Sequence, residues 1–215
     1  MAAKKKSHPK PTTVLFVRHG KTPTTGAVLP GRAPGLHLAD EGAEQAVVAG
    51  QRIAAAGKVA AVYASPMERT KETAAPIAKA LGLRVRTAKG LVECDFGKWT
   101  GRKLAELRKL PEWATVQSNP TGFRFPGGES FPEMQTRMTG QVRDLVAAHP
   151  GETIVAVSHA DTIKAALADA LGTHLDLFQR IVVNPCSISV VMYTATGPIV
   201  LAQNSTGDLA QLMPA

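Results

Sequence analysis

Short runs of β-branched and other apolar residues alternate along the chain with longer stretches in which apolar residues recur at helical spacing. The runs predict six strands, the last of them antiparallel: Thr13–Val17, Val59–Ala64, Arg84–Leu91, Thr153–Val157, Ser187–Tyr193 and Ile199–Gln203. The longer stretches predict helices over Asp40–Ala56, Pro66–Leu81, Lys103–Leu107, Phe131–His149 and Asp161–Leu171. This alternation is typical of an α/β domain with a largely parallel central sheet.

The helix predicted over Pro66–Leu81 has a clear start signal. Ser65 can cap it, Pro66 suits the first helical position, and Glu68 completes a capping box. Pro76 lies inside the same pattern, where its missing N–H and its ring predict a kink or a break.

The chain is long enough for one sizeable domain, since 44% of its 215 residues are hydrophobic. We expect a flexible basic tail over residues 1–11 and one domain over residues 12–215. Residues 111–132 are rich in Pro, Gly and Asn, which predicts an irregular excursion from the core and makes this segment the candidate cap or substrate loop.

A net charge of +8 and a pI near 9.7 favour anionic partners. We expect no nucleic-acid partner, because only 5% of residues are aromatic and no nucleic-acid-binding module is visible. We expect no membrane partner either, since the lysine-rich start is followed by no apolar stretch long enough for a signal peptide or a span. Two cysteines are too few for a disulfide framework and predict reduced thiols in a cytoplasmic protein.

Two histidines and two arginines follow predicted strands. Arg18 and His19 end the first strand, His159 ends the fourth, and Arg69 comes shortly after the second. Ligands of open α/β sheets bind outside the carboxyl ends of the strands, so we expect these four side chains to converge on one pocket.

Such a pocket suits phosphoryl transfer. A neutral imidazole at His19 can attack phosphorus, while Arg18 and Arg69 offer planar forks that match phosphoryl oxygens. We expect His159 to add a third donor. Further contacts to the phosphate are expected from Thr22, Thr25 and the backbone N–H of Ala160.

A leaving alkoxide needs a proton, and Glu93 is the carboxyl group to which we assign this role. Its neighbourhood is partly apolar, which raises a carboxyl pKa. Asp95 is the rival, and pairing of Glu93 with a nearby lysine is the structural alternative. The sequence has no metal-ligand pattern, so we expect neither a metal nor another cofactor.

Basic residues in the flanking loops are candidates for a carboxylate or second phosphate of the substrate. We assign Arg32 to substrate binding and add three further candidates for the rim, Lys98, Arg102 and Arg124.

Five motifs resemble the histidine phosphatase superfamily (branch 1, phosphoglycerate mutase-like), in family order. Residues 17–22 (VRHGKT) are similar to its R-H-G-x-T/S motif, and residues 65–74 (SPMERTKETA) to its S-P-x-x-R-x-x-x-T-A. Residues 91–101 (LVECDFGKWTG) resemble L-x-E-x-x-F-G-x-W-x-G, and residues 127–130 (GGES) and 157–159 (VSH) resemble its G-G-E-S and second histidine motifs. Ser130 has a structural alternative, because with Glu133 it can form a capping box.

The resemblance implies a three-layer α/β/α sandwich, no metal, and roles for Arg18, His19, Arg69, Glu93 and His159 like those above. Three positions depart from the family pattern: Thr25 stands where Asn is frequent, Thr100 where Glu is frequent, and Ala160 where Gly is frequent. We expect the first change either to weaken a phosphate contact or to remake it with a hydroxyl group, and the last to narrow the pocket.

The expected function is hydrolysis of a small anionic phosphomonoester through phospho-His19. The alternative within the resemblance is a phosphoglycerate mutase or other phosphomutase, so the enzyme is either a phosphomonoesterase of the histidine acid phosphatase type or a phosphomutase. Only residues 94–126 separate Glu93 from the GGES motif, whereas the mutases resembled have a large insertion there, and this favours the phosphatase. A third reading is a non-catalytic protein that binds a phosphorylated ligand. The resemblance also makes a homodimer an expectation.

Overall fold

The computed structural model describes residues 10–207, so most of the expected basic tail lies outside the described residues. Its centre is a mixed six-stranded sheet in the order β3-β2-β4-β1-β5-β6. The strands are β1 (Thr12–Arg18), β2 (Ala61–Ala64), β3 (Val85–Thr87), β4 (Thr153–Ser158), β5 (Ile188–Thr194) and β6 (Gly197–Ser205). The first four are parallel, whereas β5 and β6 are antiparallel to their neighbours. The expected sheet is confirmed.

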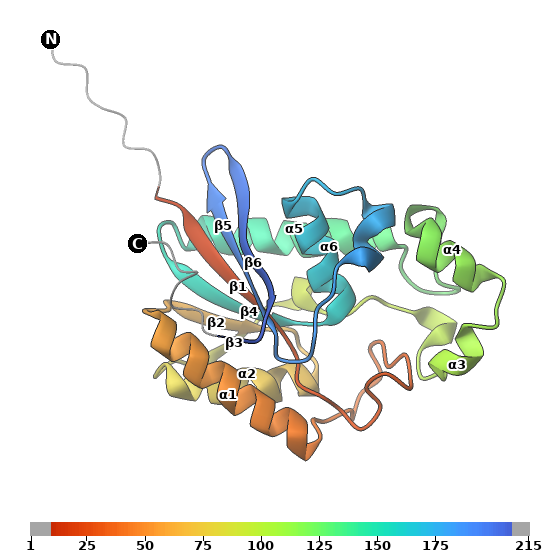
Figure 1. Cartoon of the computed structure of the whole chain (residues 1–215), viewed down its shortest axis with the longest axis horizontal. Coiled ribbons are helices and arrows are strands. Elements are labelled where there is room, and N and C mark those ends of the chain that lie inside the picture. Colours follow the sequence, from red (N-terminus) through yellow and green to blue (C-terminus); the bar gives the residue numbers. More distant parts are fainter. Residues whose placement is uncertain (1–9, 208–215) are drawn as a thin grey trace, which may run out of the picture.

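Helices cover both faces of the sheet (Figure 1). The four long ones are α1 (Asp40–Ala56), α2 (Glu68–Ala80), α5 (Phe131–Ala148) and α6 (Ala160–Ala170). Side chains alternate along β1: Val14 and Phe16 pack into the core that contains α5 and α6, whereas Leu15 and Val17 pack into the core that contains α1 and α2. All four are essentially inaccessible to solvent, which places β1 at the centre of the three layers.

Helix α2 differs from its prediction in two features, the cap expected at Ser65 and the kink or break expected at Pro76. It begins at Glu68 with Met67 as the N-cap residue and no side-chain cap, and Ser65 Oγ instead contacts His159 Nε2 at 2.8 Å and accepts weakly from Met67 N–H at 3.5 Å. Pro76 does not break it. Packing compensates for the lost hydrogen bond, since Ile77 is buried against the sheet and α1 contacts this turn so closely that a Cβ on Gly50 would lie 3.0 Å from the Pro76 carbonyl oxygen.

Two further predictions need correction. The strand expected over Arg84–Leu91 is limited to β3, and a 3-10 turn, η1 (Lys89–Leu91), follows because Leu91 turns into the core. The segment 111–132 is not irregular throughout: it holds α4 (Glu112–Ser118) and η3 (Pro120–Gly122). Helix α3 (Leu104–Leu107) precedes it, and Figure 1 shows α3 and α4 to one side of the sheet. The remaining 3-10 turns are η2 (Gly97–Trp99) and η4 (Leu175–Arg180).

Candidate active site

Polar motif residues follow three neighbouring parallel strands, β2, β4 and β1. Ser65 comes directly after β2, His159 after β4 and His19 after β1. Parallel strands end at the same edge of a sheet, and the ring centroids of His19 and His159 are only 5.3 Å apart. The fold thus brings together two imidazoles that are far apart in the sequence.

His19 is held as a neutral imidazole with a defined tautomer. Its Nδ1 lies 2.8 Å from the carbonyl oxygen of Gly20, which can only accept a hydrogen bond. Nδ1 therefore carries the proton, and the lone pair is on Nε2. Burial, with the charges of Arg69 and Arg18, lowers the pKa of His19 to about 3. The ring is consequently a free base over the whole neutral pH range.

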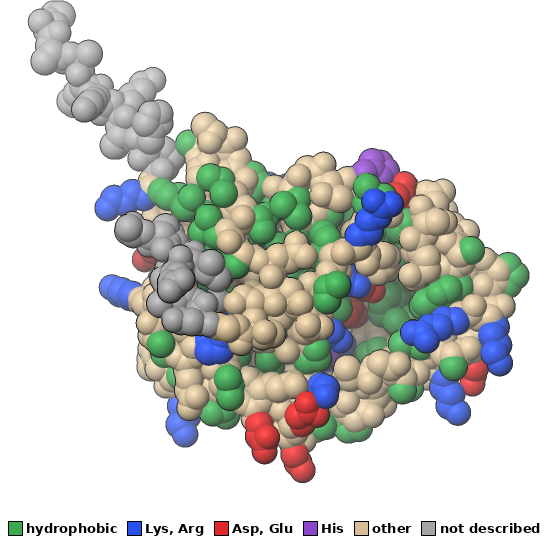
Figure 2. Space-filling view, viewed as in Figure 1, with side chains coloured by type: hydrophobic (Ala, Val, Ile, Leu, Met, Phe, Trp, Pro, Cys, Tyr) green, Lys and Arg blue, Asp and Glu red, His purple; other side chains and the backbone are tan. Residues whose placement is uncertain are grey.

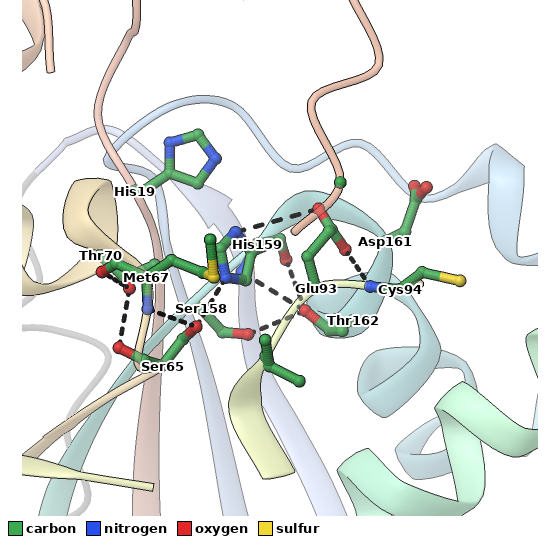
Figure 3. A network of polar contacts seen from close by, with 12 residues as sticks. His19, Ser65, Met67, Thr70, Glu93, Cys94, Ser158, His159, Asp161 and Thr162 are labelled. Atoms are coloured by element: carbon green, nitrogen blue, oxygen red, sulfur yellow. Dashed lines mark hydrogen bonds and ion pairs between the residues drawn. The ribbon is translucent and has the colours of Figure 1, made fainter. Parts of the chain in front are cut away.

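His159 links two other parts of the site and is inaccessible to solvent. Its Nε2 lies 2.8 Å from Ser65 Oγ, and its Nδ1 lies 3.1 Å from Nη2 of Arg69, which can only donate. Nδ1 is therefore the acceptor, and Nε2–H donates to Ser65 (Figure 3). Burial and the nearby arginines hold the pKa of His159 well below its usual value.

Arg69 and Arg18 present donors that no described residue uses. Nη2 of Arg69 also donates to the Gly31 carbonyl oxygen, but its Nε and Nη1 are buried and have no hydrogen-bond partner within residues 10–207. Arg18 donates from Nη1 to the Val183 carbonyl oxygen, and its Nε is likewise unpartnered in that range. Buried donors are normally satisfied, so these three nitrogens mark a place suited to an anion.

Glu93 has the surroundings of a proton donor. It is 7% exposed, its Oε1 accepts from Cys94 N–H at 3.0 Å, and its Oε2 lies 4.0 Å from Nδ1 of His159. Burial and the charge of Asp161 raise its pKa to about 7, against the opposing effect of Arg69. A carboxyl group with this pKa is partly protonated at neutral pH, as a general acid must be.

A cavity of about 250 Å³ lies beside these groups, but Arg69 and His159 are fully buried and do not line it. Six of the predicted site residues line it: Arg18, His19, Thr22, Thr25, Glu93 and Ala160. Thr25 Oγ1 accepts from Thr22 N–H at 2.9 Å, so these two threonines hold the loop that leaves β1.

The wall of the cavity also contains Asp161 and Lys164, which sequence reasoning did not single out. The sequence could have pointed to them, because Asp161 and Lys164 are three residues apart just after the second histidine motif and therefore lie on one face of α6.

Arg32 does not line this cavity, because its guanidinium group binds a backbone carbonyl oxygen and a carboxylate instead. Its Nε donates to the Glu93 carbonyl oxygen at 2.8 Å, and its Nη2 lies 2.8 Å from Glu129 Oε2. Arg137 grips Glu129 with Nε and Nη2, each at 2.9 Å, and donates from Nη1 to the Val92 carbonyl oxygen. Arg32 and Arg137, held by Glu129, thus fix the backbone of the segment that carries Glu93.

The other rim candidates, Lys98, Arg102 and Arg124, do not line the cavity either. Arg124 pairs with Glu133 on the surface. The capping box of Ser130 and Glu133 is confirmed at the start of α5.

Both cysteines are free and buried. Among the described residues, no helix combines the length and the apolar character needed to cross a membrane.

Comparisons with known proteins support one family. The model of the histidine phosphatase superfamily (branch 1) matches residues 14–206. Phosphoserine phosphatase 1 of Hydrogenobacter thermophilus is 29% identical over 203 residues, covering 92% of this chain and 94% of that protein. A probable phosphoglycerate mutase of Yersinia enterocolitica is 31% identical over 210 residues, covering 94% and 96%. Mycobacterial relatives that are 34% identical are longer, and the chain spans only 55% of their length.

Solved structures show the same fold. Phosphoserine phosphatase of Entamoeba histolytica, in complex with 3-phosphoglyceric acid, superposes with a TM-score of 0.81 at 26% identity, covering 91% of this chain and 98% of that one. Proteins of this family are phosphatases or phosphomutases that act on small phosphate esters. With both histidine motifs on adjacent strand ends and the family model matched from β1 to β6, this chain belongs to branch 1 of the histidine phosphatase superfamily.

Proposed function

We propose that the protein is a phosphatase that hydrolyses small anionic phosphomonoesters through a covalent phosphohistidine at His19. The proposal rests on the state of this ring: Nδ1–H donates to the Gly20 carbonyl oxygen, which leaves an unprotonated Nε2 near unpartnered guanidinium donors. A neutral imidazole nucleophile needs no base to activate it, because it is already unprotonated.

The first half-reaction transfers the phosphoryl group to the enzyme. Nε2 of His19 forms the new bond to phosphorus while the bond from phosphorus to the ester oxygen breaks. Glu93 gives its proton to the leaving oxygen. Arg18 and Arg69 balance the charge on the other phosphoryl oxygens. His159 stays neutral and holds Arg69 in place, because its Nδ1 accepts from Arg69 Nη2 while its Nε2 donates to Ser65.

The second half-reaction restores the free enzyme. Glu93, now a carboxylate, takes a proton from a water molecule, whose oxygen attacks phosphorus as the bond to Nε2 breaks. Inorganic phosphate then leaves, and Glu93 is again protonated. The threonine hydroxyl groups at positions 22 and 25 and the N-terminal end of α6 at Ala160 complete the oxygen-binding surface.

A phosphomutase is the second candidate, since a relative with 31% identity carries the name of a probable phosphoglycerate mutase. The two activities share the first half-reaction and differ in what opens the phosphohistidine. The short connection between Glu93 and the GGES motif favours water as the acceptor.

Phosphorus NMR distinguishes a phosphatase from a mutase by the products that each forms. Wild-type protein and the His19→Ala variant are incubated with phosphoserine, 3-phosphoglycerate and phenyl phosphate, and the phosphorus products are followed. The proposal predicts inorganic phosphate from at least one ester with wild type and none with the variant. An isomeric ester without inorganic phosphate would identify a mutase, and binding without turnover of any ester would support the non-catalytic alternative.

A further inference from the structure

A second chamber adjoins the cavity above His19. Its volume is about 280 Å³, and it shares five lining residues with the first cavity: Leu29, Phe96, Leu104, Asp161 and Lys164. Figure 2 shows a hollow on this face of the molecule with hydrophobic side chains on its walls. The two spaces are therefore neighbouring parts of one depression between the β1–α1 loop, α3, α4 and α6.

The walls of the second chamber are aromatic and rigid. Phe96, Phe125 and Phe131 contribute, and each is at most 2% exposed. Their rings interlock edge to face, with centroids 4.9 Å apart for Phe96 and Phe125 and 5.2 Å apart for Phe125 and Phe131. Trp113 and Val116 of α4 close the other side. A chamber with such walls is already formed and needs no rearrangement to accept an apolar group.

The charged groups between the two spaces neutralise each other. Lys164 Nζ lies 3.4 Å from Asp161 Oδ1 and 3.1 Å from Gln179 Oε1, and it also approaches the ring of Phe178. A lysine paired in this way is a poor site for a second anion. The lining also includes Arg108, Gln117 and Gln179, so the chamber combines aromatic walls with polar groups.

We propose that the alcohol part of the physiological substrate carries an apolar, ring-sized group that occupies the aromatic chamber while its phosphate lies against His19. This inference rests on the proposed phosphatase function. An apolar protein cavity of about 150 Å³ is enough to bind benzene, so this chamber has room for a ring. Phosphoserine and 3-phosphoglycerate have only small polar substituents and would leave the aromatic walls without a partner.

Two alkyl esters that differ only in the ring test the proposal: ethyl phosphate and 2-phenylethyl phosphate. Both release an alkyl alcohol, so the leaving-group chemistry is matched and the difference in kcat/KM reports on the ring. Burial of one ring predicts a preference for 2-phenylethyl phosphate of about tenfold or more. Equal kcat/KM for the two esters would overturn the inference.

Variants of Trp113 localise the effect. Trp113→Ala removes one wall and is expected to lower kcat/KM for 2-phenylethyl phosphate by about tenfold, mainly through KM, with little change for ethyl phosphate. Trp113→Phe keeps an aromatic wall and should retain the preference. Loss of activity on both esters alike, with an unchanged melting temperature, would count against the chamber as a substrate site.

A binding measurement tests the chamber even if the proposed phosphatase function is wrong. If wild type hydrolyses neither ester, calorimetric binding of 2-phenylethylphosphonate and ethylphosphonate still measures the chamber. Tighter binding of the phenylethyl compound that Trp113→Ala abolishes supports the inference without turnover, and equal binding contradicts it.

Discussion

Oγ of Ser65 lies 2.8 Å from Nε2 of His159, and neither residue is accessible to solvent. This contact joins the end of β2 to the end of β4, and Arg69 sets its direction, because a guanidinium group can only donate to Nδ1 and the ring proton is then on Nε2. The distance from Nδ1 to Arg69 Nη2 is 3.1 Å. One hydroxyl group thus helps to hold, through His159, a guanidinium group on which the phosphate site depends.

Removing that hydroxyl group leaves a buried N–H without a partner. Ser65→Ala should lower the free energy of unfolding by about 1–3 kcal/mol, measured by urea denaturation. Ser187→Ala is the matched control, because Ser187 is equally buried and its Oγ has no hydrogen-bond partner in residues 10–207. The control should be close to neutral, and equal losses in the two variants would contradict the role given to Ser65.

The pKa of Glu93 predicts the pH dependence of the reaction. Burial, followed by the charge of Asp161, raises this pKa to about 7, and only the protonated form can give a proton to the leaving group. The kcat/KM for an alkyl phosphate should therefore be highest below this pKa and fall as pH rises through it. Asp161→Asn removes a charge that raises the pKa, so it should move the fall to lower pH. A rate that rises across the same range would contradict the assignment.

Substitution of Glu93 itself gives a second readout. Glu93→Gln should slow hydrolysis of an alkyl phosphate by about 100-fold or more. Glu93 also acts in the second half-reaction, so the comparison uses kcat/KM, which reports transfer to His19. In kcat/KM the loss with 4-nitrophenyl phosphate should be much smaller, because its leaving group needs little protonation. Equal losses with both esters would show that Glu93 acts by holding the site together rather than as an acid.

Close packing of the segment after His19 against α1 predicts a strong effect at Gly42. A Cβ there would lie 2.0 Å from the Lys21 carbonyl oxygen, so that backbone must move. Gly42→Ala should lower the free energy of unfolding by about 1–3 kcal/mol and reduce phosphatase activity, because the shift displaces the loop that carries His19.

Gly140 in α5 is the matched helical control for Gly42. A Cβ at this position would meet nothing closer than Arg143 Nη2 at 3.8 Å. Gly140→Ala should therefore stabilise the protein by about 0.5–1 kcal/mol through helix propensity, and its activity should stay unchanged. Urea denaturation should show that Gly42→Ala lowers the free energy of unfolding and Gly140→Ala raises it. A stabilising Gly42→Ala would contradict close packing between Gly42 and Lys21.

The sheet and the placement of His19 and His159 could be predicted because both follow from short-range patterns. Alternating strand and helix signals imply parallel strands, and parallel strands place their carboxyl ends at one edge. The start of α2 could not be predicted in the same way. Ser65 carries a local capping signal, but His159, 94 residues away, engages its hydroxyl group.

Arg32 is a second residue whose contacts could not be predicted from its neighbours in the sequence. Its place in a loop near the motifs predicted a contact with substrate, which stays a prediction. In the fold its Nε donates to the Glu93 carbonyl oxygen, 61 residues away, and its guanidinium group approaches Glu129. Such pairings depend on how distant loops meet, and no local periodicity records them. The aromatic chamber formed with α4 escaped prediction for the same reason, since its walls come from four separate segments.

Trapping the phosphoenzyme shows whether His19 is the residue that becomes phosphorylated. Wild-type protein and the His19→Ala variant are mixed with 4-nitrophenyl phosphate, quenched in base to preserve phosphohistidine, and analysed by peptide mass spectrometry. We expect one added phosphoryl group on the wild-type peptide that contains His19, and none anywhere on the variant. A phosphoryl group on another residue, or turnover by His19→Ala at the wild-type rate, would contradict this role of His19.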